Sequence, residues 1–275
     1  MWVVHIPAIE QRVGIGHAAL GSLLLLLAAG ALCGMQMTGP LADRFGSHRT
    51  TIGFASLLAL ATVGPGLASA PWHLGLALAV FGFANGALDV SMNSQAVVVE
   101  QRYGRPIMAA FHGVFSAGGI VGSLVGAATL AAGVSPPVTL AVAGSCALVA
   151  VVPIVPHLIR TEPAPARPAT RSRNGYPRKV LLLGGVAFGL MLSEGVANDW
   201  SALQVKERLG SADSVAALAF GAFSATMTLG RFVADRAQQS LRGDGQRRQV
   251  PSLERAVLAQ LPDQFDRAGD IACEE

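Results

Sequence analysis

Charged residues are scarce in this chain of 275 residues: Asp, Glu, Lys and Arg together make up only 13% of it. Soluble domains carry about a quarter of charged residues, and their apolar residues recur as stripes instead of long runs. Hydrophobic residues here reach 52% of the chain. The composition therefore argues against a water-soluble globular domain.

Cysteines and the motifs of hydrolases or metal sites are few or absent. Cys33 and Cys146 lie inside apolar runs and Cys273 lies in a polar C-terminal stretch, so no disulfide framework is expected. The sequence holds no G-x-S-x-G, H-E-x-x-H or closely spaced His/Cys set. We therefore expect no metal, no other cofactor and no catalytic residues. His112 and Ser116, one helical turn apart, leave a membrane-embedded hydrolase as a remote alternative.

Long runs without charge dominate the chain instead. A hydrocarbon core about 30 Å thick needs ~20 helical residues to cross it, and the alternation typical of a membrane β-barrel strand is missing. The sequence therefore predicts an all-α membrane protein, a polytopic helix bundle. Its spans are expected at residues 19–38, 51–69, 72–96, 108–132, 136–157, 180–200 and 215–233.

The N-terminal stretch Trp2–Ile9 is apolar but covers only about a third of a span. It lacks the basic leader of a signal peptide. We expect it to be the outer end of a first helix whose beginning is missing, so that the complete spans are helices two to eight.

Basic residues gather in alternate connections. One side of the membrane would hold Arg44, Arg49, Arg102, Arg105, Arg160, Arg167, Arg171, Arg173, Arg178, Lys179, Arg231 and Arg236, whereas the other would hold Arg12, Lys206 and Arg208. Lys and Arg prefer the cytoplasmic side in short loops, so the first set predicts the cytoplasmic side. This topology also explains the basic linker without any nucleic-acid partner.

Composition divides the chain into four parts. Residues 1–157 form an N-terminal helix bundle, and residues 158–179, rich in Pro, Ala and Arg, are typical of a flexible cytoplasmic linker. Residues 180–236 hold two further spans. Residues 237–275 are polar and of mixed charge, which predicts a disordered cytoplasmic tail, with a short amphipathic helix around 253–261 as the alternative.

The connection between the second and third helices reads Gly39-Pro-Leu-Ala-Asp-Arg-Phe-Gly-Ser-His-Arg-Thr50. It resembles the signature cytoplasmic loop of the major facilitator superfamily, G-x-L-a-D-r-x-G-r-r. The matching residues are Gly39, Leu41, Asp43, Arg44, Gly46 and Arg49. A fainter copy follows the eighth helix, one six-helix repeat later, in Gly230, Arg231, Asp235 and Arg236.

This resemblance implies a fold and a function. Members of the superfamily consist of two six-helix halves, so the chain would comprise the N-terminal half and the first two helices of the second, truncated at both ends. The resemblance implies a secondary transporter in a bacterial inner membrane whose signature loops gate alternating access. The segments Gly86–Ala96 and Gly113–Gly119 are similar to a bacterial subgroup related to fucose permeases.

A few polar residues inside the spans are candidates for a substrate or proton pathway, because an ionisable group at a span centre costs ~2.5–3.5 kcal/mol on insertion scales. Asn85, Asp89 and Asn93 recur every four residues and form one stripe. Asp89 and His112 are expected at similar depth, which suits either proton coupling or a structural hydrogen bond. Glu194 and Asn198 form a further pair of candidates on the seventh helix.

Two hypotheses about function follow. In the first, the chain moves a small polar solute, sugar-like or another metabolite, by alternating access with or without protons. In the second, it is a truncated, non-transporting membrane fragment of such a transporter. Its expected partners are the solute, protons and the lipid bilayer, and the sequence makes no prediction about self-association.

Gly118, Gly122 and Gly126, four residues apart, predict close helix packing in the fifth helix.

Overall fold

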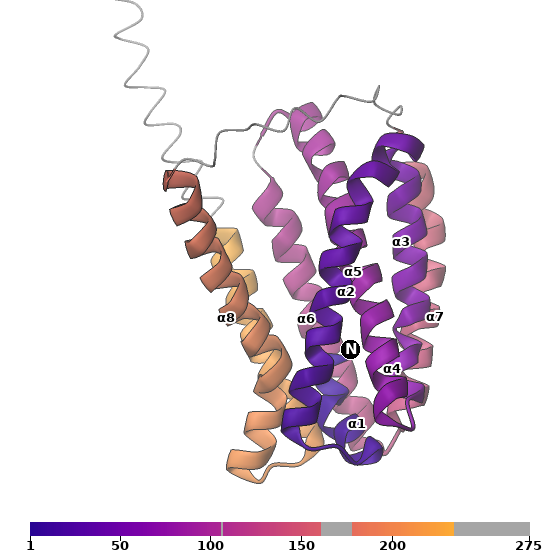
Figure 1. Ribbon diagram of the computed structural model, residues 1–275, viewed down its shortest axis with the longest axis vertical. Helices are drawn as coiled ribbons and strands as arrows, with labels where there is room; N and C mark the ends of the chain where they lie inside the picture. Colours follow the sequence, from indigo (N-terminus) through magenta and orange to yellow (C-terminus); the bar gives the residue numbers. More distant parts are fainter. Residues whose placement is uncertain (106, 161–177, 234–275) are drawn as a thin grey trace, which may run out of the picture.

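The computed structural model describes residues 1–105, 107–160 and 178–233, and within these ranges every regular element is helical. The chain begins with η1 (Val3–His5) and α1 (Ile6–Val13). The long helices are α2 (His17–Phe45), α3 (Ser47–Ala61), α5 (Pro71–Tyr103), α6 (Met108–Ala131), α7 (Pro136–Ile154) and α8 (Arg178–Leu209), with the short α4 (Val63–Leu67) and η2 (Val155–His157) among them. A last helix runs over Asp213–Val233. Figure 1 shows them side by side as one bundle.

Seven helical stretches among the described residues are long and apolar enough to cross a membrane, which confirms the predicted polytopic bundle. Most helices extend beyond their expected ends. α2 continues through Gly39 and Pro40 to Phe45, and α5 continues to Tyr103. The residues from 39 to 45, expected in a loop, are therefore the last turns of a helix.

The expected span 51–69 is broken near its end, because α3 ends at Ala61 and α4 starts at Val63. Pro65 explains the break. It has no backbone N–H to give to the carbonyl four residues earlier, which is that of Ala61. The proline is visible in the sequence, but hydropathy alone does not show that a proline interrupts the helix.

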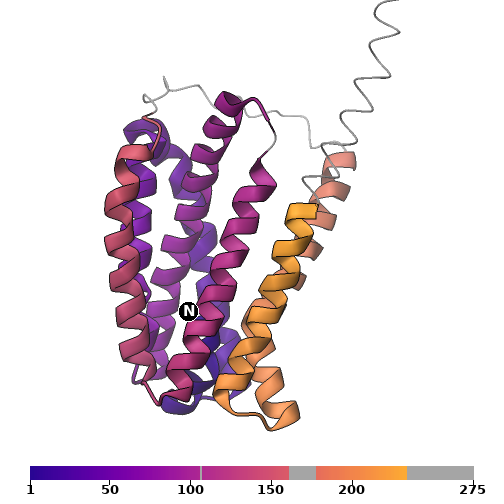
Figure 2. The same cartoon turned by 180° about the vertical axis from the view of Figure 1, so that it is seen from behind.

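The connections alternate between two ends of the bundle (Figure 1). The α1–α2, α4–α5 and α6–α7 connections and the turn before Asp213 lie at one end, here called the α1–α2 end. The α2–α3 and α5–α6 connections lie at the other, the α2–α3 end. The helices before residue 160 are called the first group below, and α8 with the helix Asp213–Val233 the second group. Figure 2 shows the second group standing beside α6.

The N-terminal segment is part of the core. Trp2, Ile6 and Ile9 are buried and pack in one cluster with Leu20, Leu24, Leu74, Leu78, Leu140 and Leu203. These come from α2, α5, α7 and α8, so η1 and α1 fill the centre of the bundle toward the α1–α2 end. The N-terminus itself lies inside the bundle outline, partway along its length (Figure 1).

Backbone contact between α2 and α5 depends on glycine. A Cβ placed on Gly82 or Gly86 would overlap the carbonyl oxygen of Leu27 or Ala31 on α2, and a Cβ on Gly30 would overlap that of Ala79 on α5. Without side chains at these positions, two helix backbones approach closely, as is common in membrane bundles. Thr38, buried on α2, adds a hydrogen bond of 3.2 Å from its hydroxyl to the Ala87 carbonyl.

Gln95 joins three segments at the α2–α3 end. Its amide nitrogen donates to the Ser47 hydroxyl at 2.6 Å and to the Ile159 carbonyl at 3.0 Å. Its amide oxygen accepts the Ile159 N–H at 3.1 Å. A buried Gln on α5 therefore fixes the start of α3 and the segment that follows η2, and no sequence motif pointed to it.

Candidate functional site

A cavity of about 600 Å³ lies between the first and second groups. The N-terminal segment, α2, α5 and α6 line it on one side, and α8 and the helix Asp213–Val233 on the other. Its polar lining consists of Asn85, Ser116, Glu194, Asn198, Asp199 and Ser224. Its aromatic lining consists of Trp2, Phe81, Phe115, Phe220 and Phe223. A pocket with apolar walls and a few polar groups is typical of small-molecule sites.

Three of the predicted pathway residues reach this cavity. Asn85 on α5 and Glu194 and Asn198 on α8 line it from opposite sides. α5 brings Asn85 there, and the one-turn spacing of Glu194 and Asn198 puts both side chains on the same face of α8.

The other three predicted residues lie elsewhere. Asp89 accepts a hydrogen bond of 3.2 Å from the Asn93 amide, one turn further along α5. Within the described residues, no hydrogen bond or ion pair joins Asp89 to His112. α5 packs chiefly on α2 and α3 and meets α6 at few points, so similar depth does not bring these two side chains together.

Arg231 connects the two groups beside the cavity. Its guanidinium donates to the His112 carbonyl at 3.1 Å and to the Ser116 hydroxyl, both on α6. It also forms an ion pair of 3.2 Å with Glu194 on α8. Both charged side chains are largely buried, with 22% and 23% exposed. A charged pair in such surroundings needs the hydrogen bonds that His112 and Ser116 provide.

The sequence assigned Arg231 to the second signature copy after the eighth helix, although the expected span 215–233 already included it; the structure places it inside the helix Asp213–Val233. Gly230 lies in the same last turns, and a Cβ there would meet no described atom within 4 Å apart from the adjoining backbone of its own helix. Asp235 and Arg236 lie outside the described residues, as do residues 161–177 of the linker and the tail 237–275. The Arg231–Glu194 pair was missed, although two opposite charges in neighbouring spans were a signal for it.

The first signature copy lies at the α2–α3 end. Asp43 and Arg44 occupy the last turn of α2, Gly46 connects the helices with a φ of 83°, and Arg49 lies in the first turn of α3. A φ in that range is strained for any residue with a side chain. Asp43 is exposed and forms no hydrogen bond or ion pair within the described part of the chain.

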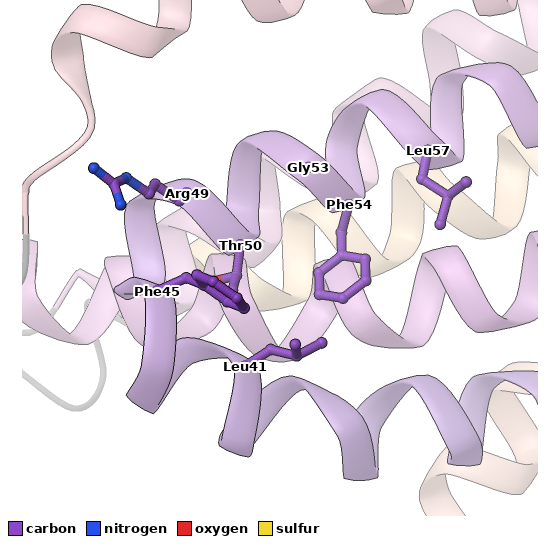
Figure 3. A pocket seen from close by; sticks show the side chains of 7 residues that line it. All are labelled: Leu41, Phe45, Arg49, Thr50, Gly53, Phe54 and Leu57. Atoms are coloured by element: carbon purple, nitrogen blue, oxygen red, sulfur yellow. The ribbon is translucent and has the colours of Figure 1, made fainter. Parts of the chain in front are cut away.

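A groove of about 260 Å³ runs beside this connection. Leu41 and Phe45 of α2 and Phe54 and Leu57 of α3 line it, and Arg49 lies at its edge (Figure 3). The Arg44 guanidinium lies 5.2 Å from the centre of the Phe45 ring. Of the signature residues, Leu41 and Arg49 line this groove, and no described signature residue lines the cavity between the groups.

α6 presents small residues to the helix Asp213–Val233. A Cβ on Gly113 would meet Phe232, one on Gly119 would meet Ser224, and one on Gly221 would meet Ser123 in the same way. Ser123 also donates a hydrogen bond of 2.6 Å to the Ala217 carbonyl. This face differs from the predicted one, because Gly122 and Gly126 lie against Met1 and Val4. A Cβ on Gly118 would meet no described atom within 4 Å apart from the adjoining backbone of α6.

The spans, the two-group bundle and the cavity between the groups have the features of a membrane transporter. The family model of the Major Facilitator Superfamily matches residues 2–243. The chain belongs to this superfamily, and this membership points to a transporter rather than an enzyme.

Three relatives support the assignment. An uncharacterized MFS-type transporter of Yersinia pestis is 34% identical over 236 residues, covering 86% of this chain and 61% of the relative. An uncharacterized transporter of Sinorhizobium fredii is 33% identical over 241 residues (85% and 62%). The membrane protein MosC of Rhizobium meliloti is 32% identical over 244 residues (87% and 58%). The chain thus spans about three-fifths of the length of these relatives.

Proposed function

We propose that this chain carries a small polar solute across the membrane by alternating access, as a secondary transporter. The observation that supports the proposal most directly is the cavity between the two groups, with Glu194, Asn198 and Asn85 on its walls. Polar and charged groups inside spans are costly unless they face a partner or a water-filled cavity. Because these three side chains line one cavity, contact with water or a solute there accounts for their presence inside the spans.

The proposed orientation puts the α2–α3 end in the cytoplasm of a bacterial inner membrane. Arg44, Arg49, Arg102 and Arg105 lie at that end, whereas Arg12, Lys206 and Arg208 lie at the other. Positively charged loops remain preferentially on the cytoplasmic side. The linker and the C-terminal tail then also belong to the cytoplasm.

Glu194 is the proposed proton or solute group of the pathway. It lines the cavity, where an entering solute can compete with Arg231 for the Glu194 carboxylate. Asp89, Asn93 and His112 remain proposed pathway residues with weaker support, since they do not line the cavity. The similarity of Gly86–Ala96 and Gly113–Gly119 to fucose-permease relatives supports testing sugars first.

Uptake into vesicles containing the purified chain tests the proposal. We expect time-dependent uptake of one member of a labelled panel of sugars and related metabolites, increased by a proton gradient and reduced by a protonophore. Vesicles without protein provide the control. If correctly inserted chain shows no uptake of any compound, the second candidate is favoured, in which this chain does not transport by itself. Its share of about three-fifths of the relatives' length motivates that candidate.

The signature residues are proposed to gate the cytoplasmic side. Asp43 carries its charge at the end of α2, exposed and without a partner in the described part of the chain, so it is free to pair when the ends of the helices approach each other. Asp43→Asn is expected to lower the uptake rate about tenfold if one charge-assisted contact of ~1.5 kcal/mol is lost. Arg208→Gln, exposed at the opposite end, controls for a general change of charge. Equal uptake by Asp43→Asn and the unaltered chain would contradict the gating role.

A further inference from the structure

His17 lies between two carboxylates at the α1–α2 end. Its Nδ1 is 2.6 Å from Glu10 Oε1, and its Nε2 is 2.5 Å from Glu207 Oε1. Glu10 is on α1 and His17 is the first residue of α2, both in the first group, whereas Glu207 is near the end of α8 in the second group. The imidazole therefore links the two groups directly.

With both carboxylates ionised, the two contacts together require a protonated ring. A neutral imidazole has one N–H and one bare nitrogen, so it donates to one carboxylate while its lone pair faces the other. The imidazolium donates at both nitrogens and its charge attracts both carboxylates. When the proton leaves, one contact becomes repulsive and the two negative charges lose the cation between them.

The link lies where the two groups touch. The last part of α8 packs on the first group, with Ala202 and Leu203 buried and Trp200 against the cluster of Ile6, Ile9 and Leu20. By contrast, the side chains of residues 180–193 are exposed. The separation between α8 and the first group increases from the α1–α2 end to the α2–α3 end (Figure 1). The groups are thus closed together at the end that holds His17.

Most other ionisable groups at this end make contacts of their own or are exposed, whereas His5 on η1 is buried and forms no hydrogen bond with either carboxylate within the described residues. The Arg12 guanidinium donates to the Gly66 and Ala68 carbonyls at 2.5 and 2.8 Å, Lys206 pairs with Asp213 at 2.6 Å, and His73 on α5 contacts the Ser69 hydroxyl at 3.1 Å. Arg208 is exposed at the end of α8. Of the groups facing the two carboxylates, His17 is the one whose charge ordinarily changes between about pH 5 and 8.

We propose that His17 is a proton-binding site that holds the α1–α2 end closed: the protonated ring binds Glu10 and Glu207 together, and loss of the proton releases α8 from the first group. Closure at this end is therefore favoured at low pH and weakened as pH rises through the titration of the ring. The inference rests on the relative movement of the two groups contained in the proposed function. It assigns that movement a chemical trigger at a place separate from the cavity's Glu194.

A distance measurement tests the proposal without any transport assay. Spin labels are attached at Leu67→Cys and Leu209→Cys, which are 65% and 74% exposed and belong to the first and second groups, after the three native cysteines are replaced by alanine. Pulsed electron paramagnetic resonance then gives the distribution of distances between the two labels in lipid nanodiscs. It is recorded at about pH 5.5 and about pH 8.5, on either side of the pH range in which histidine usually titrates. We expect the ratio of short to long distances to fall roughly two- to fivefold at the higher pH, as the loss of the one partly exposed ionic contact between the groups allows.

Three variants separate the link from other effects. His17→Gln removes the titrating group, and Glu207→Gln, whose side chain is 46% exposed, removes only the contact across the groups. Both are expected to abolish the dependence on pH, whereas His73→Gln, a histidine at the same end but within the first group, should retain it. Should His17→Gln fail to fold, Glu207→Gln still decides the question.

The proposal is overturned if the unaltered chain gives the same distance distribution at both pH values, or if Glu207→Gln keeps the full shift. Failure of the proposed transport function is a separate result. A pH-dependent distance with no solute uptake would leave the His17 link established and the transport proposal wrong. Solute uptake together with a distance that does not depend on pH would support the transport proposal and show the His17 proposal to be wrong.

Discussion

Gly86→Leu is expected to prevent stable association of α2 and α5, at a cost of about 3 kcal/mol or more, the upper range for overpacking a close contact. A Cβ at this position would overlap the carbonyl oxygen of Ala31, which is backbone and cannot rotate aside. Gly82 against Leu27 and Gly34 against Phe83 repeat the contact along the same pair of helices. Relief at one point would therefore require the two helices to separate over several turns.

The measurement is the fraction of protein in detergent that stays monodisperse after heating, recorded over a range of temperatures. Gly53→Leu is the matched control, because Gly53 lies in the neighbouring helix α3 and a Cβ there would meet no described atom within 4 Å apart from the adjoining backbone of α3. Both substitutions add the same side chain to a membrane helix. Equal midpoints for the two variants would show that α2 and α5 do not depend on the absence of a side chain at Gly86.

The number and approximate position of the spans could be predicted from the sequence, because a hydrocarbon core imposes a minimum length of apolar helix. The runs that predicted spans at 108–132 and 136–157 became α6 (Met108–Ala131) and α7 (Pro136–Ile154) with η2. The ends were harder to predict. α2 continues past Pro40 because a polar sequence at the membrane surface can still complete a helix, and hydropathy does not record that.

Helix rotation could not be predicted, since it depends on which neighbour each face packs against. The glycines at 118, 122 and 126 predicted a packing face on α6, yet the face that meets the helix Asp213–Val233 is centred on Gly119 and Ser123. A shift of one residue turns a helix by about 100°. The N-terminal segment, which occupies the other face through Met1 and Val4, accounts for the difference.

The unknown rotation of the helices also explains why the contacts at the candidate site were not predicted. Asp89 and His112 were paired by depth alone, whereas the ion pair in the structure joins Glu194 to Arg231 across α8 and the following helix. Glu194 and Asn198 both line the cavity, as their one-turn spacing on a single helix allows. Contacts between helices need the tilt and rotation of both partners, and a single sequence does not contain these in readable form.

Arg231→Gln is expected to reduce uptake by about tenfold or more and to lower stability by roughly 1–3 kcal/mol, the cost of leaving a largely buried charge without its partner. The substitution leaves Glu194 without its cation and removes donors from the His112 carbonyl and the Ser116 hydroxyl. Uptake into vesicles and the midpoint of thermal unfolding are measured on the same preparation. Arg208→Gln, an exposed arginine on α8, is the control.

The double variant Arg231→Gln with Glu194→Gln decides whether the pair belongs to the pathway or is a structural connection. Removing both charges eliminates the unpaired carboxylate, so most of the lost stability should return, because two amides can hydrogen-bond where the ion pair was. Uptake should stay low if Glu194 handles a proton or the solute, since the amide can neither titrate nor carry charge. A double variant that regains both stability and uptake would show that the ion pair only holds α8 against its neighbours. In that case the polar lining at Asn85 and Asn198 would be left to account for recognition of the solute.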